Sequence, residues 1–289
     1  MNAADRYEWA TDADPSRNYC LWDYTRRAPS EDKWRSVNLL FRSFELAGLD
    51  ARAYDIVDAL REAIGPFRTV YGVKLHEGAL SWEFYFYDYQ RLQREVSMTR
   101  VIEALSPWCR CTARPDDALP YFMFSLDIDN ALVRGERALD VLHMYVGNPG
   151  STVSSGIAYA VTAASITLEN FYFFFDAKQH QAEATAKICS SAYFDPARVA
   201  LDEVLAPQLR DCDTLCVANK RTHDCVYFSG VDVGQLQFFL ARHDYPAGIR
   251  DFVTSNAGLL DHLLFDVGTD YRMENGQLRI LKTGFYGVF

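Results

Sequence analysis

Apolar and polar positions alternate along the segment from 66 to 89, a pattern typical of a β-hairpin. Glu77-Gly78 is the expected turn. Because side chains point alternately to the two faces of a strand, one face of this hairpin is apolar and the other is polar. The polar face carries Lys74, His76, Ser81, Glu83, Tyr85 and Tyr87. Tyrosines beside charged groups indicate a sheet with a polar interior rather than an ordinary solvent-facing strand pair.

The association of a lysine with tyrosine recurs in the segment from 213 to 230. A turn at 222–223 puts Lys220 opposite Cys225, on the face that also holds Tyr227. A register inferred in this way is a hypothesis, because a slip of one residue moves every side chain to the opposite face.

A third hairpin is predicted between 260 and 288, where Asn275-Gly276 is the strongest short turn signal that a sequence offers. One face of it is expected to carry Thr269, Tyr271, Lys282 and Tyr286. Three hairpins would then each present a lysine and a tyrosine to the same side of a sheet.

Two further strand pairs are predicted, at 121–147 and 156–176. Helical spacing of apolar residues predicts helices at 33–64 (divided at Gly48), 92–105, 179–191, 196–205, 233–243 and 247–253. Ten antiparallel strands in one sheet tend to curl or close. We therefore predict an α+β fold: an antiparallel ten-stranded β-barrel built from five hairpins, surrounded by α-helices, with a lumen wide enough for small ligands.

The polar segment 1–32 contains two prolines and two tryptophans, which predicts an N-terminal arm that packs through its aromatic side chains. No linker rich in proline or glycine divides the rest of the chain. Residues 33–289 are therefore predicted to form a single barrel domain of helix–hairpin repeats.

The net charge of −10 argues against nucleic acid and against an anionic membrane as a partner. No apolar run approaches the roughly 20 residues that a membrane span needs. The N-terminus lacks the apolar core of a secretory signal, so we expect a cytoplasmic protein. The seven cysteines match no familiar zinc spacing or disulfide framework, and we expect reduced thiols and no metal site.

Several strand segments resemble those of the ABBA prenyltransferases, whose barrel is a circle of helix–strand–strand units around a solvent-filled lumen. Segment 281–286 (LKTGFY) is similar to the family's final strand, in which a lysine precedes a glycine and a tyrosine. Segment 81–83 (SWE) is similar to the first-hairpin segment that puts an acidic residue in the lumen. Segments 219–221 (NKR) with 226–228 (VYF), and 122–127 (FMFSLD), resemble two further hairpins.

The resemblance covers about residues 35–289. It implies transfer of an allylic prenyl group from its diphosphate to an aromatic (indole or phenol) or peptide side-chain acceptor. In that chemistry fixed cations hold the diphosphate, and tyrosine faces stabilise the carbocation. The implied substrate-binding residues are Lys74, Lys220, Lys282, Tyr85, Tyr227 and Tyr286. Glu83 is the implied catalytic residue, which accepts a hydrogen bond from the N–H or O–H of the acceptor.

The chain departs from the family in two places. Magnesium-dependent members carry an aspartate in the first hairpin, where Tyr85 stands here, so we expect no required cofactor. Asp127 and Asp129 share a strand face and leave Mg²⁺ as an alternative. The hairpin at 156–176 lacks the lysine expected there. The alternative function is a non-catalytic α+β protein that binds an apolar small molecule or a partner enzyme.

Overall fold

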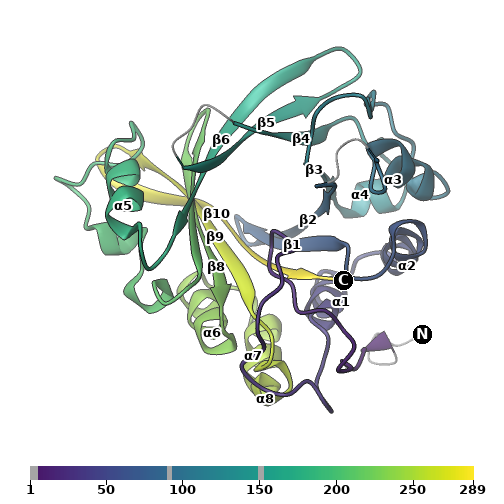
Figure 1. Cartoon of the computed structure of the whole chain (residues 1–289), viewed down its shortest axis with the longest axis horizontal. Coiled ribbons are helices and arrows are strands. Elements are labelled where there is room, and N and C mark those ends of the chain that lie inside the picture. The colour runs from purple at the N-terminus through teal and green to yellow at the C-terminus, as the bar shows by residue number, and fades with distance from the viewer. Residues whose placement is uncertain (1–5, 90–92, 149–152) are drawn as a thin grey trace.

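The computed structural model of the chain describes residues 6–89, 93–148 and 153–289, and its ten antiparallel strands close into one barrel (Figure 1). The strands are β1 Thr69–His76, β2 Ala79–Tyr87, β3 Met123–Ile128, β4 Leu142–Gly147, β5 Ser154–Val161, β6 Ile166–Asp176, β7 Thr214–Lys220, β8 Asp224–Val231, β9 Phe265–Glu274 and β10 Gln277–Val288. Consecutive strands are neighbours, and β10 pairs with β1 to complete the circle. The predicted α+β barrel of five hairpins is confirmed.

Eight α-helices surround the barrel in the described part of the chain (Figure 1). They are α1 Val37–Ala47, α2 Arg52–Ile64, α3 Met98–Leu105, α4 Asn130–Val133, α5 Gln181–Cys189, α6 Val233–Arg242, α7 Ala247–Ser255 and α8 Ala257–Leu260. Gly48 ends α1 in the left-handed conformation, with φ 61°, as its predicted dividing role requires. Among the described residues, no helix combines the length and the apolar character that crossing a membrane would take.

The helix predicted at 196–205 is wrong. The chain there contains one short 3₁₀ turn, η2 Leu201–Glu203, and a second, η3 Pro207–Leu209, follows just beyond it. Ala206, which precedes the proline of η3, is extended at ψ 125°. Pro207 disfavours helical backbone at Ala206, beyond the end of the segment, and within the segment Ala200 is also extended, at ψ 138°, which interrupts a helix.

The register of the first hairpin is as predicted. Lys74 pairs with Ser81 around a turn at Glu77-Gly78. Both turn residues have positive φ, 50° and 80°, as a type I′ turn requires.

The β7–β8 hairpin has the predicted faces, but the predicted pairing is wrong by two residues. Cys225 pairs with Ala218 rather than with Lys220. The turn closes one position earlier than expected, where the Lys220 N–H donates to the His223 carbonyl at 3.0 Å. Because a shift of two residues preserves the faces, Lys220 and Tyr227 still lie on the same side.

The β9–β10 hairpin contains a β-bulge that the sequence pattern did not predict. The extra residue lies between Ile280 and Lys282, so Lys282 pairs with Asp270. The prediction that Thr269 and Tyr271 share a face with Lys282 is wrong. Tyr271 packs in the outer core, Thr269 faces the helices, and Asp270 takes the inward position.

The main hydrophobic core lies between the outer face of the barrel and the helices. Trp82 and Phe84 of β2 point outward into it, whereas Glu83 between them points into the lumen. The Trp82 indole N–H donates to the Ser43 hydroxyl of α1 at 2.7 Å. The strands are thus apolar outside and polar inside, which leaves the lumen free for polar side chains.

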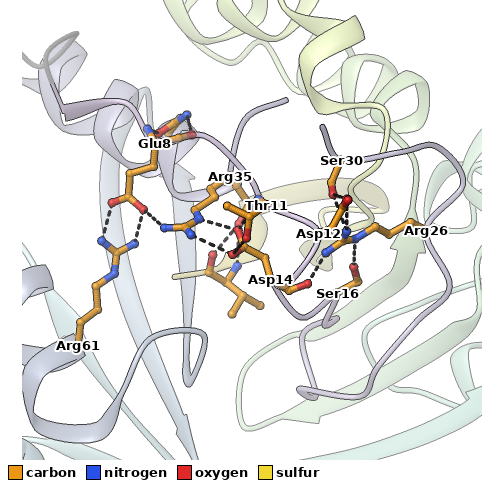
Figure 2. Close-up of polar contacts among 12 residues, drawn as sticks. Glu8, Thr11, Asp12, Asp14, Ser16, Arg26, Ser30, Arg35 and Arg61 are labelled. Carbon is orange, nitrogen blue, oxygen red and sulfur yellow. Dashed lines mark hydrogen bonds and ion pairs between the residues drawn. The ribbon is translucent and has the colours of Figure 1, made fainter. Parts of the chain in front are cut away.

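Residues 6–32 form an N-terminal arm that is fixed by an ionic network (Figure 2). Arg35, just before α1, donates to both carboxylate oxygens of Asp14 at 2.7 and 2.9 Å. Glu8 accepts hydrogen bonds from Arg35 at 3.0 Å and from Arg61 of α2 at 2.5 and 3.2 Å. These contacts hold the arm against the first two helices.

Candidate functional site

The barrel encloses a cavity of about 630 Å³, here called the lumen cavity. The three lysine-bearing hairpins present their residues in the same order from the turn inward, with the lysine first and the tyrosine deeper. The cavity is lined by all seven predicted site residues: Lys74, Lys220, Lys282, Glu83, Tyr85, Tyr227 and Tyr286. The fold thus brings together side chains that are more than 200 positions apart in the chain.

Five tyrosines form a belt around the lumen, one from the second strand of every hairpin. They are Tyr85, Tyr145, Tyr172, Tyr227 and Tyr286. Ring centroids are 5.7 Å apart for Tyr145–Tyr172, 6.4 Å for Tyr172–Tyr227, 6.1 Å for Tyr227–Tyr286 and 5.9 Å for Tyr286–Tyr85. Burial raises the pKa of each phenol well above its ordinary value, so the belt is uncharged.

Glycines on neighbouring strands make room for this tyrosine belt. Gly72 pairs with Tyr286, and Gly268 pairs with Tyr227. A Cβ atom at Gly72 would lie 2.7 Å from Cε1 of Tyr286, and one at Gly268 would lie 2.5 Å from Cδ1 of Tyr227. The rings therefore lie across the backbone of the adjacent strand, where only glycine leaves space.

Lys74 and Glu83 form a buried ion pair near the turn end of the lumen. Glu83 also accepts hydrogen bonds from the Tyr85 hydroxyl, at 2.7 Å, and from the Ser125 hydroxyl. Burial opposes both charges, but the attraction between the partners outweighs it: the pKa of Lys74 is raised and the pKa of Glu83 is lowered. Glu83 is therefore an ionised, tightly held hydrogen-bond acceptor.

Asp270 organises a second cluster across β7, β9 and β10. Its Oδ1 accepts a hydrogen bond from Lys220 Nζ at 2.8 Å, and its Oδ2 lies 3.2 Å from His223 Nε2 and 3.4 Å from Lys282 Nζ. Burial would raise the pKa of Asp270, but the charge of Lys220 holds it well below its usual range. One carboxylate thus fixes two of the three lysines.

Lys282 is the least compensated of the three lysines. Its side chain is 34% exposed, compared with 9% for Lys74 and 10% for Lys220. The charge of Lys74 and then burial lower the pKa of Lys282, and Lys220 lowers it further. Like charges therefore gather at this point, which makes it favourable for an anion.

His143 adds a further positive charge to the lumen cavity. Its Nδ1 lies 2.8 Å from Glu169 Oε2, and its Nε2 lies 3.4 Å from Asp127 Oδ2. Burial works to lower the pKa of His143, but the two carboxylates raise it to about 10, so the ring is charged at neutral pH. Asp127 also contacts Lys74 Nζ, at 3.4 Å.

The charges in the lumen nearly cancel. Lys74, Lys220, Lys282 and His143 contact the carboxylates of Glu83, Asp127, Glu169 and Asp270. Arg137, which also lines the cavity, pairs with Asp129. An incoming anion must therefore compete with carboxylates for the lysines.

The Asp127 and Asp129 pair does not fit a Mg²⁺ site. Asp127 already contacts Lys74 and His143, while Asp129 caps α4 and pairs with Arg137 at 2.8 Å. Mg²⁺ needs oxygen ligands that are free to surround it. Within residues 6–89, 93–148 and 153–289, no group of three or more histidine, cysteine, aspartate or glutamate side chains could hold a metal ion.

The arm closes the end of the lumen opposite the lysines. The ring centroid of Tyr19 lies 5.1 Å from those of Tyr85 and Tyr286, and 6.2 Å from that of Tyr87. The Tyr19 N–H donates to Asp266 of β9 at 2.8 Å. Tyr19 of the arm therefore covers the tyrosine belt on the side away from the lysines.

Sequence reasoning missed several lumen residues for identifiable reasons. Tyr145 and Tyr172 follow the same alternation that revealed Tyr85, and that signal was available. Asp270 was hidden by the bulge before Lys282. The chain matches no protein-family model, and no curated protein is similar to it in sequence. Function therefore rests on the geometry and chemistry of the lumen.

Proposed function

We propose that this chain is a prenyltransferase, which moves an allylic prenyl group from its diphosphate to an aromatic or peptide side-chain acceptor. The observation that carries the proposal is the layered lumen, in which three lysines lie at the turn end and a belt of tyrosines lies deeper. The resemblance of several strands to ABBA prenyltransferases supports the same chemistry.

The lysines would bind the diphosphate. Ionisation breaks the bond between the allylic carbon and the diphosphate oxygen, and the electron pair leaves with the diphosphate. Fixed cations stabilise that developing negative charge, and such preorganised charge is commonly the largest catalytic term. Lys282 is the main candidate because it is partly exposed and incompletely neutralised. Lys74 and Lys220 would add charge from either side.

The tyrosine belt would protect the carbocation. Aromatic faces attract a cation, and buried rings exclude the water that would quench it. The raised pKa of the phenols also matters, because a neutral phenol is a weaker nucleophile than a phenolate. The tyrosines can therefore stabilise the cation with little risk of being alkylated themselves.

Glu83 would orient the acceptor and take up its proton. It accepts a hydrogen bond from the acceptor N–H or O–H, and it receives the proton that is released when the new bond forms. Its hydrogen bonds to Lys74, Tyr85 and Ser125 hold the carboxylate in one position. The prenyl acceptor must therefore donate to a free lone pair of this carboxylate, or displace Lys74, Tyr85 or Ser125 from it.

The near-neutral lumen favours the alternative function. Each lysine already has a carboxylate partner, so a diphosphate is not needed to balance the site. A non-catalytic α+β protein that binds an apolar small molecule or a partner enzyme would need no free cation.

Calorimetric titration with dimethylallyl and geranyl thiolodiphosphates, with and without Mg²⁺, tests the proposal. We expect saturable binding that Lys282→Ala weakens at least about tenfold. Lys178→Ala is the matched control, because Lys178 is exposed outside the barrel. Absence of binding under both conditions would remove the prenyl donor and leave the alternative function.

A further inference from the structure

A second cavity, of about 50 Å³, lies on the other side of the tyrosine belt from the lysines. We call it the arm-side cavity, because Cys20 and Trp22 of the arm form part of its wall. The residues that line both cavities, and so separate them, are Tyr19, Tyr145, Tyr172 and Tyr227. The arm-side cavity is thus distinct from the lysine-bearing part of the lumen.

Asp266 brings an unbalanced carboxyl group to this cavity. Among the described residues that line it, none is a lysine, arginine or histidine, and Asp266 is the one carboxylic acid. Asp266 is 3% exposed, and its Oδ1 has no hydrogen-bond partner within the described part of the chain. A buried carboxylate without a counter-charge is costly, and a cation bound in the cavity would offset that cost.

Two hydroxyl groups beside the same cavity are also unsatisfied. The oxygens of Tyr87 and Ser229 accept no hydrogen bond from the described residues. Ser229 lies within reach to donate to Asp266, and Tyr87 lies within reach to donate to Cys20, so each hydroxyl keeps its lone pairs free for a donor in the cavity. A primary ammonium group has three N–H donors and no acceptor, which matches three oxygen acceptors.

The walls of the cavity are aromatic. Tyr19, Trp22, Phe122 and Phe174 line it together with Tyr87. A carboxylate within aromatic walls is the arrangement that recognises organic ammonium ions, since ring faces attract the cation as the carboxylate pairs with it. We infer that the arm-side cavity binds a compact primary alkylammonium ion, whose N–H groups are met by Asp266, Tyr87 and Ser229.

The size of the cavity limits the ligand. One water needs roughly 10–15 Å³ by this measure, so about 50 Å³ holds about four water-sized groups. Propylammonium, with its short apolar chain, is of that size. The inference is independent of the proposed prenyl transfer, because it uses none of the lysines of the lumen.

Protonation of Asp266 should control this binding. Burial raises the pKa of Asp266 to about 7, so the carboxylate is fully formed only above neutral pH. The surrounding groups stay neutral there, because burial also raises the pKa of Tyr19, Cys20, Tyr87, Cys216, Tyr227 and Tyr286. The nearby charge of Asp213 lies outside the cavity and is exposed.

The probe is propylammonium chloride, titrated into the whole protein by calorimetry at about pH 5.5 and about pH 8.5. We expect saturable binding at the higher pH that is at least about tenfold weaker at the lower pH, where Asp266 is protonated. Propan-1-ol has the same number of heavy atoms but no charge, and it should bind at least about tenfold more weakly. Equal binding of the two probes, or binding of neither, would overturn the inference.

Variants locate the site. Asp266→Asn preserves an acceptor for the Tyr19 N–H but removes the charge, and it should abolish propylammonium binding. Glu62→Gln removes an exposed carboxylate on α2, outside the cavity, and it should leave binding within about twofold. If Asp266→Asn binds propylammonium as tightly as the wild type does, Asp266 merely anchors the arm and the inference is wrong. The comparison of the two probes on the wild-type protein decides the matter even if a variant does not fold.

Discussion

Lys220 and Asp270 form a buried ion pair on strands that are not adjacent, with Lys220 Nζ 2.8 Å from Asp270 Oδ1. The side chain of Lys220 is 10% exposed and that of Asp270 is 4% exposed. Because β8 lies between their strands, the pair links β7 to β9 over the inner face of β8. The same ion pair therefore contributes to the stability of the barrel and fixes the position of Lys220 in the lumen.

Asp270→Asn should lower the free energy of unfolding by about 3 kcal/mol. Removal of one partner leaves the ammonium of Lys220 buried without a counter-charge, and breaking such pairs commonly costs several kcal/mol. Denaturant unfolding at neutral pH measures the change. Glu203→Gln is the matched control, because it breaks an ion pair with Arg242 of 3.1 Å in which Glu203 is 60% exposed. The control should change by less than about 1 kcal/mol, and equal losses in the two variants would contradict the prediction.

The depressed pKa of Lys282 predicts how pyrophosphate binding depends on pH. The charge of Lys74, followed by burial, lowers the pKa of Lys282 below 10.5, so this lysine loses its proton at a lower pH than an exposed lysine does. Pyrophosphate affinity should therefore fall as the pH is raised from about 7 to about 10. Lys282→Arg keeps its charge throughout that range and should flatten the decline. An identical decline in both proteins would assign the effect to another group.

Glu83→Gln should reduce prenyl transfer by about 100-fold or more, since an amide cannot take up the proton of the acceptor. Donor affinity should change by less than about threefold, because Lys74 keeps its contact with Asp127 at 3.4 Å. Turnover and calorimetric affinity are measured on the same preparation. Glu274→Gln, at the outer end of β9, is the control and should retain both. A large loss of donor affinity in Glu83→Gln would show that Glu83 acts by holding Lys74.

Gly268→Ala tests the packing of the tyrosine belt. The added methyl would lie 2.5 Å from Cδ1 of Tyr227, so the ring must tilt and the variant should lose about 1–3 kcal/mol of stability. Gly258→Ala in α8 is the control, because a Cβ there meets nothing within 4 Å. Thermal unfolding compares the two. A Gly268→Ala variant as stable as the Gly258→Ala variant would mean that Tyr227 has an alternative position of equal energy.

Alternation and turn residues were enough to predict the barrel and the inward direction of most of its site residues. Lys74 and Glu83 were placed correctly because β1 and β2 are regular and their turn is unambiguous. The bulge after Ile280 has no comparable signal, since Leu281 resembles any other strand residue. The role of Asp270 as partner to two lysines therefore could not be predicted.

The position of the arm depends on contacts that no local pattern contains. Tyr19 and Asp266 are 247 positions apart, and their hydrogen bond exists only once the barrel has closed. A short polar segment with aromatic residues indicates that it packs on something, but it does not indicate where. Two features could therefore be found only in the structure: Tyr19 closes one end of the lumen, and Asp266 lines the arm-side cavity.

Asp266 should make the protein less stable as the pH rises through neutrality. Burial raises its pKa from 3.8 to about 7. Below about pH 3 the group is mostly protonated in both the folded and the unfolded state. Between the two values the unfolded chain releases a proton that the folded chain retains, so the free energy of unfolding falls with increasing pH.

Asp266→Asn removes this dependence. Relative to the wild type, the variant should gain about 3 kcal/mol of stability between about pH 5 and about pH 8, because each pKa unit corresponds to about 1.4 kcal/mol. Denaturant unfolding of both proteins across this range gives the difference directly. Glu62→Gln, which removes an exposed carboxylate of α2, is the control variant. Parallel curves for wild type and Asp266→Asn would mean that Asp266 already has a counter-charge or ready access to water. Either explanation would also remove the basis for an ammonium ion in the arm-side cavity.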